Sequence, residues 1–288
     1  MNNTKIDYCT KSWNPVTGCY HNCEYCYARK IAKRFADPYV VGYDGTYVLS
    51  DKASQYIENP QLQDGHILLA QKNPIFKNIG LLKPNGKSYS AYPFGFCPTF
   101  HCQRLYDPSH VKKPQTIFVC SMADLFGDWV PDEWIQKVFD ACQNAPWHRY
   151  LFLTKNPKRY NEIRTNRTRG ISISRDLRNR VWLGATATTQ EQLYFAASAL
   201  EDADQTVFTF LSIEPIFEPV SVYEIDCFAN WVIIGAETGN RKNKPVVCKW
   251  WIDDIVKQCK DMNVPIFMKE SLRTLMGADF KQEFPWGG

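Results

Sequence analysis

Three cysteines near the N-terminus have the spacing needed to bind an iron–sulfur cluster. Cys19, Cys23 and Cys26 form the pattern C-x3-C-x2-C, and Tyr25 is the aromatic residue just before the last cysteine. Three thiolates in a short loop can hold three corners of a four-iron, four-sulfur cube and leave the fourth iron open to a second molecule. We expect Cys23 and Cys26 to lie in the first turn of a helix that runs to Phe35, because residues three apart share one side of a helix.

Other chemistry could use the same residues. A zinc site needs a fourth ligand, which His21, Cys9 or Cys102 could supply, although the sequence has no second C-x2-C or H-x3-H pair. An electron-transfer cluster would also need a fourth cysteine. The three cysteines could instead be ordinary core residues. Cys97, His101 and Cys102 are a weaker candidate for a second metal site, because their spacing is irregular and no fourth ligand is evident.

The composition is that of a globular protein with reduced thiols. The chain has 288 residues, of which 44% are hydrophobic and 22% are charged, enough for one large domain with a substantial core. The sequence begins without an apolar signal stretch and has no run of membrane-spanning length, so we expect a cytoplasmic protein with no membrane association. In that compartment its 11 cysteines are better explained as metal ligands and core residues than as disulfides.

Apolar runs alternate with amphipathic stretches from residue 116 onward. Strands are predicted at residues 116–120, 150–154, 181–185, 207–213, 231–235 and 264–268, and helices at 131–139, from 189 and at 250–259. Runs that are apolar on both faces indicate parallel strands covered by helices. The sequence therefore predicts a single α/β domain over residues 1–288, a partial or full TIM-type barrel. An open doubly wound sheet is the alternative, but no glycine-rich loop follows a strand.

Two further features follow from this organisation. Residues from about 37 to 111 interrupt the alternation and are interpreted as a long irregular insertion after the first helix. Polar residues come directly after the strand runs, where the active face of a barrel lies. They are Ser121, Asp124, Thr154, Lys155, Thr186, Thr188, Ser212, Glu214, Glu237, Lys269 and Glu270.

The cysteine motif resembles the signature of radical S-adenosylmethionine (SAM) enzymes. Residues 13–19, 121–126, 153–157, 211–215 and 233–239, together with Phe100-His101-x2-Arg104-Leu105, also resemble a phage and bacterial family of radical SAM-like proteins described as phage proteins of unknown function. Many of those relatives have a longer gap between the first two cysteines, whereas this chain has the short gap of the superfamily. The resemblance covers nearly the whole chain.

The resemblance implies a [4Fe-4S] cluster at the carboxyl-terminal mouth of the barrel, with SAM bound to the free iron through its amino and carboxylate groups. Reductive cleavage of SAM would give a 5′-deoxyadenosyl radical that abstracts hydrogen from a substrate. The implied cofactor-binding residues are Tyr25, Ser121, Asp124, Thr186, Ser212, Glu214 and Glu237. Among them, Glu214 and Glu237 would contact the SAM amine or ribose, and Tyr25 would lie against adenine. At Ser121 and Asp124 this chain lacks the usual Gly-Gly-Glu.

The partners are less defined by the sequence. A radical SAM enzyme needs a reductant such as flavodoxin or ferredoxin. The net charge of +4 is too small to indicate nucleic acid, but the helix after the cysteines has a basic face, and the insertion is rich in Tyr and Phe that could stack on bases. A small-molecule or peptide substrate fits equally well. The alternative function is a non-catalytic binding module stabilised by zinc or by a cluster.

Overall fold

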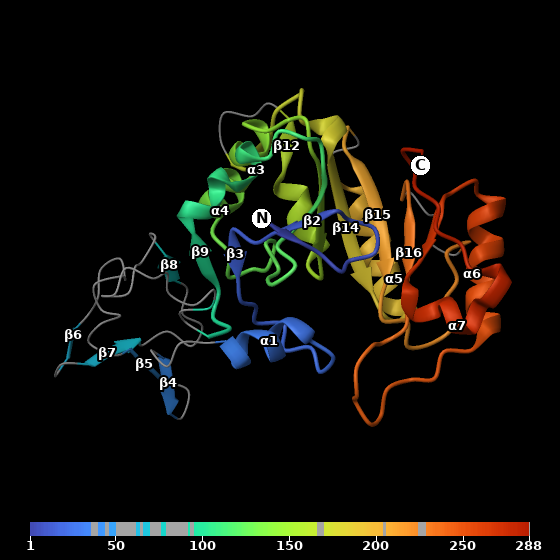
Figure 1. Ribbon diagram of the computed structural model, residues 1–288, viewed down its shortest axis with the longest axis horizontal. Helices are drawn as coiled ribbons and strands as arrows, with labels where there is room; N and C mark the ends of the chain where they lie inside the picture. The colour runs from blue at the N-terminus through green and yellow to red at the C-terminus, as the bar shows by residue number, and fades with distance from the viewer. Residues whose placement is uncertain are drawn as a thin grey trace.

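A curved sheet of eight strands forms the centre of the computed structural model (Figure 1). The structure describes residues 1–35, 40–43, 46–49, 62–63, 66–69, 76–78, 92, 95–165, 170–203, 206–223 and 229–287. The strand order is β1-β2-β10-β11-β14-β15-β16-β17, and all neighbours pair in parallel except β1 with β2. The strands are β1 (Asn2–Asn3), β2 (Lys11–Trp13), β10 (Thr116–Val119), β11 (Arg149–Thr154), β14 (Val181–Ala187), β15 (Phe208–Ile213), β16 (Val232–Ile234) and β17 (Ile266–Met268).

The parallel strands follow one another in chain order, as in a TIM-type barrel, but β17 does not pair with β2 in the described part of the chain. The fold is therefore a partial barrel, which confirms the predicted fold class. The long helices are α4 (Asp132–Gln143), α5 (Gln190–Glu201) and α6 (Lys249–Asp261). They connect β10 to β11, β14 to β15 and β16 to β17, the connections that parallel strands require. All six predicted strands and the three helices predicted after residue 116 are present, whereas the short strands β1 and β2 of this sheet were not predicted.

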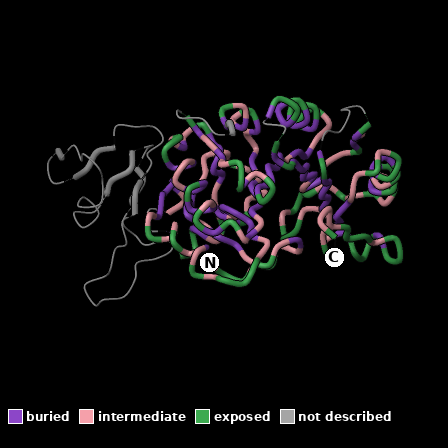
Figure 2. Tube along the Cα trace, turned by 90° about the horizontal axis from the view of Figure 1, so that it is seen from above, coloured by how far each residue is buried: buried purple, intermediate pink, exposed green. Residues whose placement is uncertain are grey.

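Two apolar layers lie on opposite faces of the sheet. The outer layer packs α4, α5 and α6 against the strands, and buried segments fill the centre of the molecule in Figure 2. The inner layer is mostly aromatic and fills the barrel; its members are Tyr8, Phe118, Leu151, Trp182, Phe210, Trp231, Ile233 and Phe267. Gly184 makes room for this packing, because a Cβ there would lie 2.2 Å from the Phe210 ring. Large rings can thus fill the interior where one strand presents no side chain.

The N-terminal segment closes the open side of the barrel. Tyr8 packs edge-on against Phe118 of β10 (6.0 Å) and Phe267 of β17 (5.8 Å), which bridges strands near the two ends of the sheet. The backbone N–H of Glu270 donates to the Asp7 carboxylate (2.8 Å). The free edge of β17 is covered by the C-terminal segment, since the N–H of Met268 donates to the carbonyl of Lys281 (2.8 Å).

Smaller elements complete the described chain. They are α1 (Tyr27–Phe35), α3 (Asp107–His110), α7 (Arg273–Met276), β3 (Val16–Thr17), β4 (Val40–Tyr43), β5 (Thr46–Leu49), β6 (Leu62–Gln63), β7 (His66–Leu69), β8 (Phe76–Asn78), β9 (Thr99–His101), β12 (Arg164–Thr165) and β13 (Ser172–Ile173), with 3-10 turns η1 (Cys102–Tyr106), η2 (Pro157–Glu162), η3 (Arg178–Arg180), η5 (Glu270–Leu272) and η6 (Gly277–Asp279). Much of the predicted insertion at 37–111 lies outside the described residues. Its end packs on the core, where Phe100 of β9 stacks on Trp134 of α4 (5.2 Å). None of the helices among the described residues is long and apolar enough to cross a bilayer.

Candidate active site at the carboxyl ends of the strands

The cysteine loop is held against the barrel by backbone contacts on both sides. It leaves β3 through Gly18, whose φ of +87° favours glycine. A Cβ on Gly18 would lie 2.2 Å from the carbonyl oxygen of Cys97, so the chain passes too close for any side chain. The N–H of Gly18 donates to the carbonyl of Met122 (2.8 Å), and that of Cys19 donates to the carbonyl of Phe96 (3.1 Å). The loop therefore has a fixed position beside the end of β10.

The helix that follows begins later than the sequence predicted. α1 starts at Tyr27, so Cys23 and Cys26 precede it instead of sharing its first turn. A turn joins them, in which the N–H of Cys26 donates to the carbonyl of Cys23 (3.2 Å). The Sγ of Cys26 then accepts from the N–H of Arg29 (3.3 Å), as a helix-capping side chain does. The expected helix start was wrong because Cys26 caps the helix with its side chain, and a capping residue precedes the first helical residue.

All three cysteines line one cavity of about 190 Å³, which we call the cysteine cavity. Its walls include apolar side chains such as Phe96 and Phe118. Burial, and next the negative charge of Asp124, raise the pKa of Cys19 to about 12. A thiolate at this position therefore needs a positively charged centre beside it. Three sulfur donors facing one apolar space fit a cluster of iron and sulfide, for which thiolates are the usual ligands.

One buried carboxylate organises the wall next to Cys19. The Oδ1 atom of Asp124 accepts from the N–H of Phe126 (3.0 Å) and the hydroxyl of Thr154 (2.7 Å). Its Oδ2 atom accepts from the N–H of Lys155 (2.9 Å) and lies 2.7 Å from His21 Nε2. Burial opposes ionisation, but the hydrogen bond and charge of His21 and the other donors outweigh it and hold the pKa of Asp124 below its ordinary value. Asp124 thus ties the cysteine loop, through His21, to the ends of β10 and β11.

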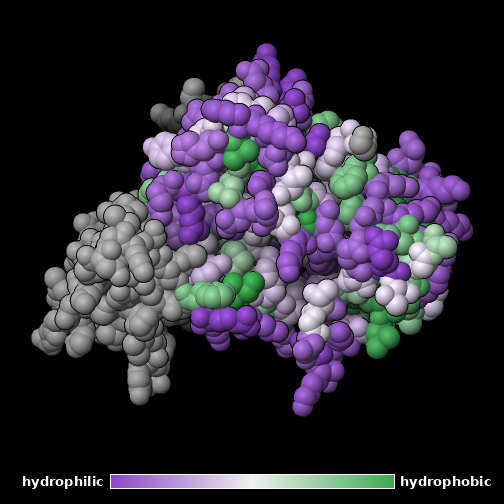
Figure 3. Space-filling view, viewed as in Figure 1, coloured by the Kyte–Doolittle hydropathy of each residue, from purple (hydrophilic) through white to green (hydrophobic). Residues whose placement is uncertain are grey.

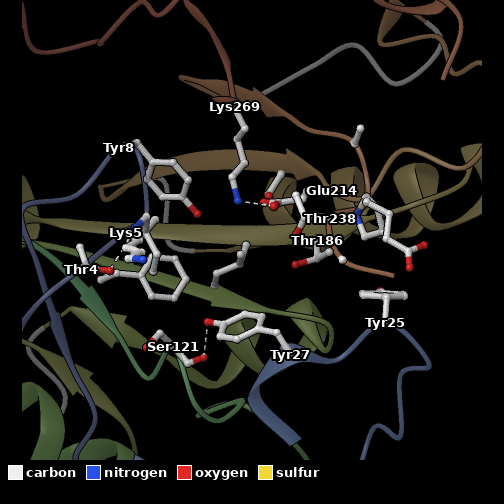
Figure 4. Close-up of a pocket in the computed structure, with 18 of the residues that line it drawn as sticks. Thr4, Lys5, Tyr8, Tyr25, Tyr27, Ser121, Thr186, Glu214, Thr238 and Lys269 are labelled. Atoms are coloured by element: carbon white, nitrogen blue, oxygen red, sulfur yellow. Dashed lines mark hydrogen bonds and ion pairs between the residues drawn. The ribbon is translucent and has the colours of Figure 1, made fainter. Parts of the chain in front are cut away.

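A second cavity of about 620 Å³ adjoins the first; we call it the large cavity (Figure 4). Its volume is within the range of about 300–1,000 Å³ that small-molecule sites occupy. The described residues that line both cavities are Tyr25, Tyr27, Phe118, Ser121, Leu153, Lys155 and Thr186. A ligand in the large cavity would therefore reach the wall of the cysteine cavity.

The structure brings the seven candidate cofactor-binding residues to these two cavities. Asp124 lines the cysteine cavity, Tyr25, Ser121 and Thr186 line both, and Ser212, Glu214 and Glu237 line the large cavity. Apart from Tyr25 of the cysteine loop, they come from the carboxyl ends of β10, β14, β15 and β16. Whether they bind a cofactor stays a prediction.

Among the candidate cofactor-binding residues, Ser212 has a buried hydroxyl without a hydrogen-bond partner in the described structure. The residue lies on β15 and is fully buried. An unpaired buried hydroxyl costs about 1–3 kcal/mol. Because Ser212 lines the large cavity, a polar group of a bound molecule could supply the missing partner.

The two glutamates at the large cavity are held by cations. Lys269 donates to Glu214 across the cavity wall (Figure 4). Both oxygens of Glu237 accept from the Arg241 guanidinium, at 2.8 and 2.7 Å. The hydrogen bond from Arg241 is the main cause that lowers the pKa of Glu237. Both carboxylates are therefore held in place by these cations as hydrogen-bond acceptors.

Lys155 links the wall of the large cavity to the cysteine loop. Its Nζ donates to the hydroxyl of Tyr25 (2.7 Å) and lies 5.1 Å from the centre of that ring. Tyr25 also makes an edge contact with Phe217 (5.5 Å). The ring between the two cavities is thus fixed from both sides.

Other polar residues from the sequence lie elsewhere. The hydroxyl of Thr188 donates to Gln192 (2.9 Å), and Glu270 pairs with Arg273 (2.6 Å) away from both cavities. Of the suspected second metal site, His101 is buried with its Nε2 2.8 Å from the Thr17 hydroxyl. Across the described ranges, no three His, Cys, Asp or Glu side chains gather closely enough to hold a single metal ion.

Several residues that line the large cavity were not predicted from the sequence. The N-terminal residues Asn3, Thr4, Lys5 and Ile6 form one wall, together with Tyr8 (Figure 4). Tyr27, Lys30 and Thr238 also line the cavity. The basic face after the cysteines was a signal for Lys30, whereas no local pattern marks residues 3–6, which reach the site only because the barrel is open on that side.

The fold and the site define a class of protein: a partial parallel barrel with a cysteine-lined cavity at the carboxyl ends of its strands. The chain belongs to the family described as protein of unknown function (DUF5131), whose model matches residues 3–78 and 83–274. No curated protein matches the sequence. Among solved structures, the chain is similar to a mutant form of spore photoproduct lyase, with 8% identity, a TM-score of 0.48, and coverage of 93% of this chain and 79% of that one. The resemblance to a phage family finds no support in these comparisons.

Proposed function

We propose that this protein is a radical SAM enzyme. The observation that carries the proposal is that all three cysteines of the C-x3-C-x2-C loop line one cavity, next to a larger one at the carboxyl ends of the strands. In this proposal Cys19, Cys23 and Cys26 hold a [4Fe-4S] cluster, and SAM lies where the two cavities meet. Together these cofactors would supply a 5′-deoxyadenosyl radical that abstracts hydrogen from a substrate in the large cavity.

The chain's own residues would bind and orient the cofactor. Glu214 can accept from an ammonium or a ribose hydroxyl, and the hydroxyls of Thr186 and Ser212 can pair with polar atoms of the ligand. Tyr25, fixed by Lys155, offers a flat face for an adenine ring. Apolar walls formed by Phe118 and Leu153 would keep water from the reacting atoms.

The alternative, a zinc-stabilised binding module, has less support. A structural zinc ion needs four ligands arranged around one centre. Of the candidate fourth ligands, His21 is held by Asp124 (2.7 Å), and neither Cys9 nor Cys102 lines the cysteine cavity. A cluster distributes its cysteine ligands over different irons, so it does not need the three sulfurs to converge on one point.

Metal analysis of protein purified without oxygen tests the proposal. We expect about four irons and four sulfides per chain, visible absorption from the cluster, and 5′-deoxyadenosine after reduction in the presence of SAM. Cys23→Ala should abolish the visible absorption, whereas Cys248→Ala, which changes an exposed cysteine elsewhere, should leave it intact. Colourless protein with stoichiometric zinc, or full absorption in Cys23→Ala, would overturn the proposal.

A further inference from the structure

The large cavity has an excess of positive charge. The charged residues among those described in its lining are Lys5, Lys30, Lys155, Lys269, Glu214 and Glu237. Both glutamates are already paired, Glu214 with Lys269 and Glu237 with Arg241. Lys5 and Lys30 form no ion pair with any residue that the structure describes. A cavity with this balance favours an anionic ligand.

The positive charge continues out of the cavity along α1. Lys33 and Arg34 follow Lys30 by three and four residues, so the three side chains lie on neighbouring parts of one helix surface. All three are exposed, and α1 contains no acidic residue. Figure 3 shows hydrophilic residues gathered at the lower edge of the molecule, where α1 lies. The axial rise from Lys30 to Arg34 is about 6 Å. Lys30 lines the large cavity, whereas Lys33 and Arg34 do not.

Aromatic rings lie beside these cations. Tyr25 and Tyr27 both line the large cavity, and Tyr27 is 53% exposed. Its hydroxyl donates to the carbonyl of Ser121 (2.7 Å), which fixes the ring at the cavity wall (Figure 4). Fixed aromatic rings next to a row of cations are the combination with which proteins bind unpaired bases and the adjoining phosphates.

We propose that the substrate is a single-stranded nucleic acid, with one nucleotide in the large cavity and its flanking phosphates along Lys30, Lys33 and Arg34. A small phosphorylated compound would not use the part of the row outside the cavity. A stacked duplex cannot place a base in a cavity without unpairing it. The inference deepens the proposed function, because it names the substrate of the same site, but strand binding itself needs no cluster.

Fluorescence anisotropy with a labelled 12-nucleotide oligothymidine tests this proposal on the full chain. The affinity should be measured between 50 and 200 mM salt for the wild type, for the triple variant Lys30→Ala/Lys33→Ala/Arg34→Ala, and for the control Lys112→Ala/Lys113→Ala/Lys260→Ala. The control removes the same charge from exposed positions outside α1. Circular dichroism should show that both triple variants fold.

We expect the α1 variant to weaken binding at least tenfold at 50 mM salt and the control to change it less than threefold. The slope of log affinity against log salt should fall by about 2 in the α1 variant, since three phosphate contacts contribute about 0.7 each on a single strand. No binding at about 100 µM protein, equal losses in the two variants, or equal affinity for duplex DNA or for heparin would each overturn the proposal.

The same assay separates this inference from the proposed reaction. Wild-type protein from which iron has been removed should still bind the oligonucleotide with unchanged affinity. If the wild-type protein contains no cluster but binds the strand, and the α1 variant does not bind it, the proposed reaction is wrong and the nucleic-acid inference stands. If SAM is cleaved but no strand binds, the reverse holds.

Discussion

The change Asp124→Asn should destabilise the protein strongly, although it only replaces one carboxylate oxygen with an NH₂ group of similar size. In the wild type each carboxylate oxygen accepts one backbone N–H, from Phe126 or from Lys155, and one side-chain donor. An asparagine amide must place its NH₂ group on one side, where it faces a backbone N–H that cannot turn away. One buried N–H is then unpaired and charge-assisted bonds are lost, which together cost about 2–4 kcal/mol.

Urea unfolding of the cluster-free protein measures this cost. With a slope near 3 kcal/mol per molar urea, the midpoint should fall by about 1 M. Tryptophan fluorescence and circular dichroism should give coincident transitions. The control Asp128→Asn removes the charge from an exposed carboxylate that accepts from the Asn156 amide (2.6 Å), and it should change stability by less than about 0.5 kcal/mol. Equal stability of the two variants would refute the argument that Asp124 organises the site.

The pH dependence gives a second check with a defined sign. The folded-state pKa of Asp124 lies below its ordinary value of 3.8, so the carboxylate stabilises the fold above that pH, and the contribution is lost as pH falls through the lower folded value. The difference in unfolding free energy between wild type and Asp124→Asn should thus shrink as the pH falls below about 4. A difference that grows as the pH falls below about 4 would contradict this assignment.

Two further predictions concern the loop and the unpaired hydroxyl. Gly18→Ala should lower the iron content of reconstituted protein several-fold and destabilise the chain, because the new Cβ would lie 2.2 Å from the Cys97 carbonyl; iron content equal to wild type would contradict this close approach. Ser212→Ala should leave the unfolding free energy of the ligand-free protein equal or raise it by about 1 kcal/mol, since it removes an unpaired buried hydroxyl. The same variant should weaken SAM binding by about tenfold in calorimetry, and an unchanged affinity would remove Ser212 from the site.

Local patterns in the sequence account for the elements and for the cysteine loop. Apolar runs such as 150–154 and 181–185 became β11 and β14 because a strand buried on both faces needs apolar residues throughout. The polar residues after them face one mouth because parallel strands end at the same edge of the sheet. The start of α1 was misplaced, since the Sγ of Cys26 caps the helix instead of joining it.

Only the tertiary structure decided which distant groups meet at the site. The carboxylate of Asp124 pairs with His21, 103 residues away, and Lys155 reaches Tyr25 across 130 residues. The N-terminal residues that wall the large cavity owe their place to Tyr8, which wedges between the inner rings of β10 and β17. Residue type and spacing encode the strands and their chemistry, whereas these contacts depend on the curvature and strand order of the whole sheet, which no local run of sequence contains.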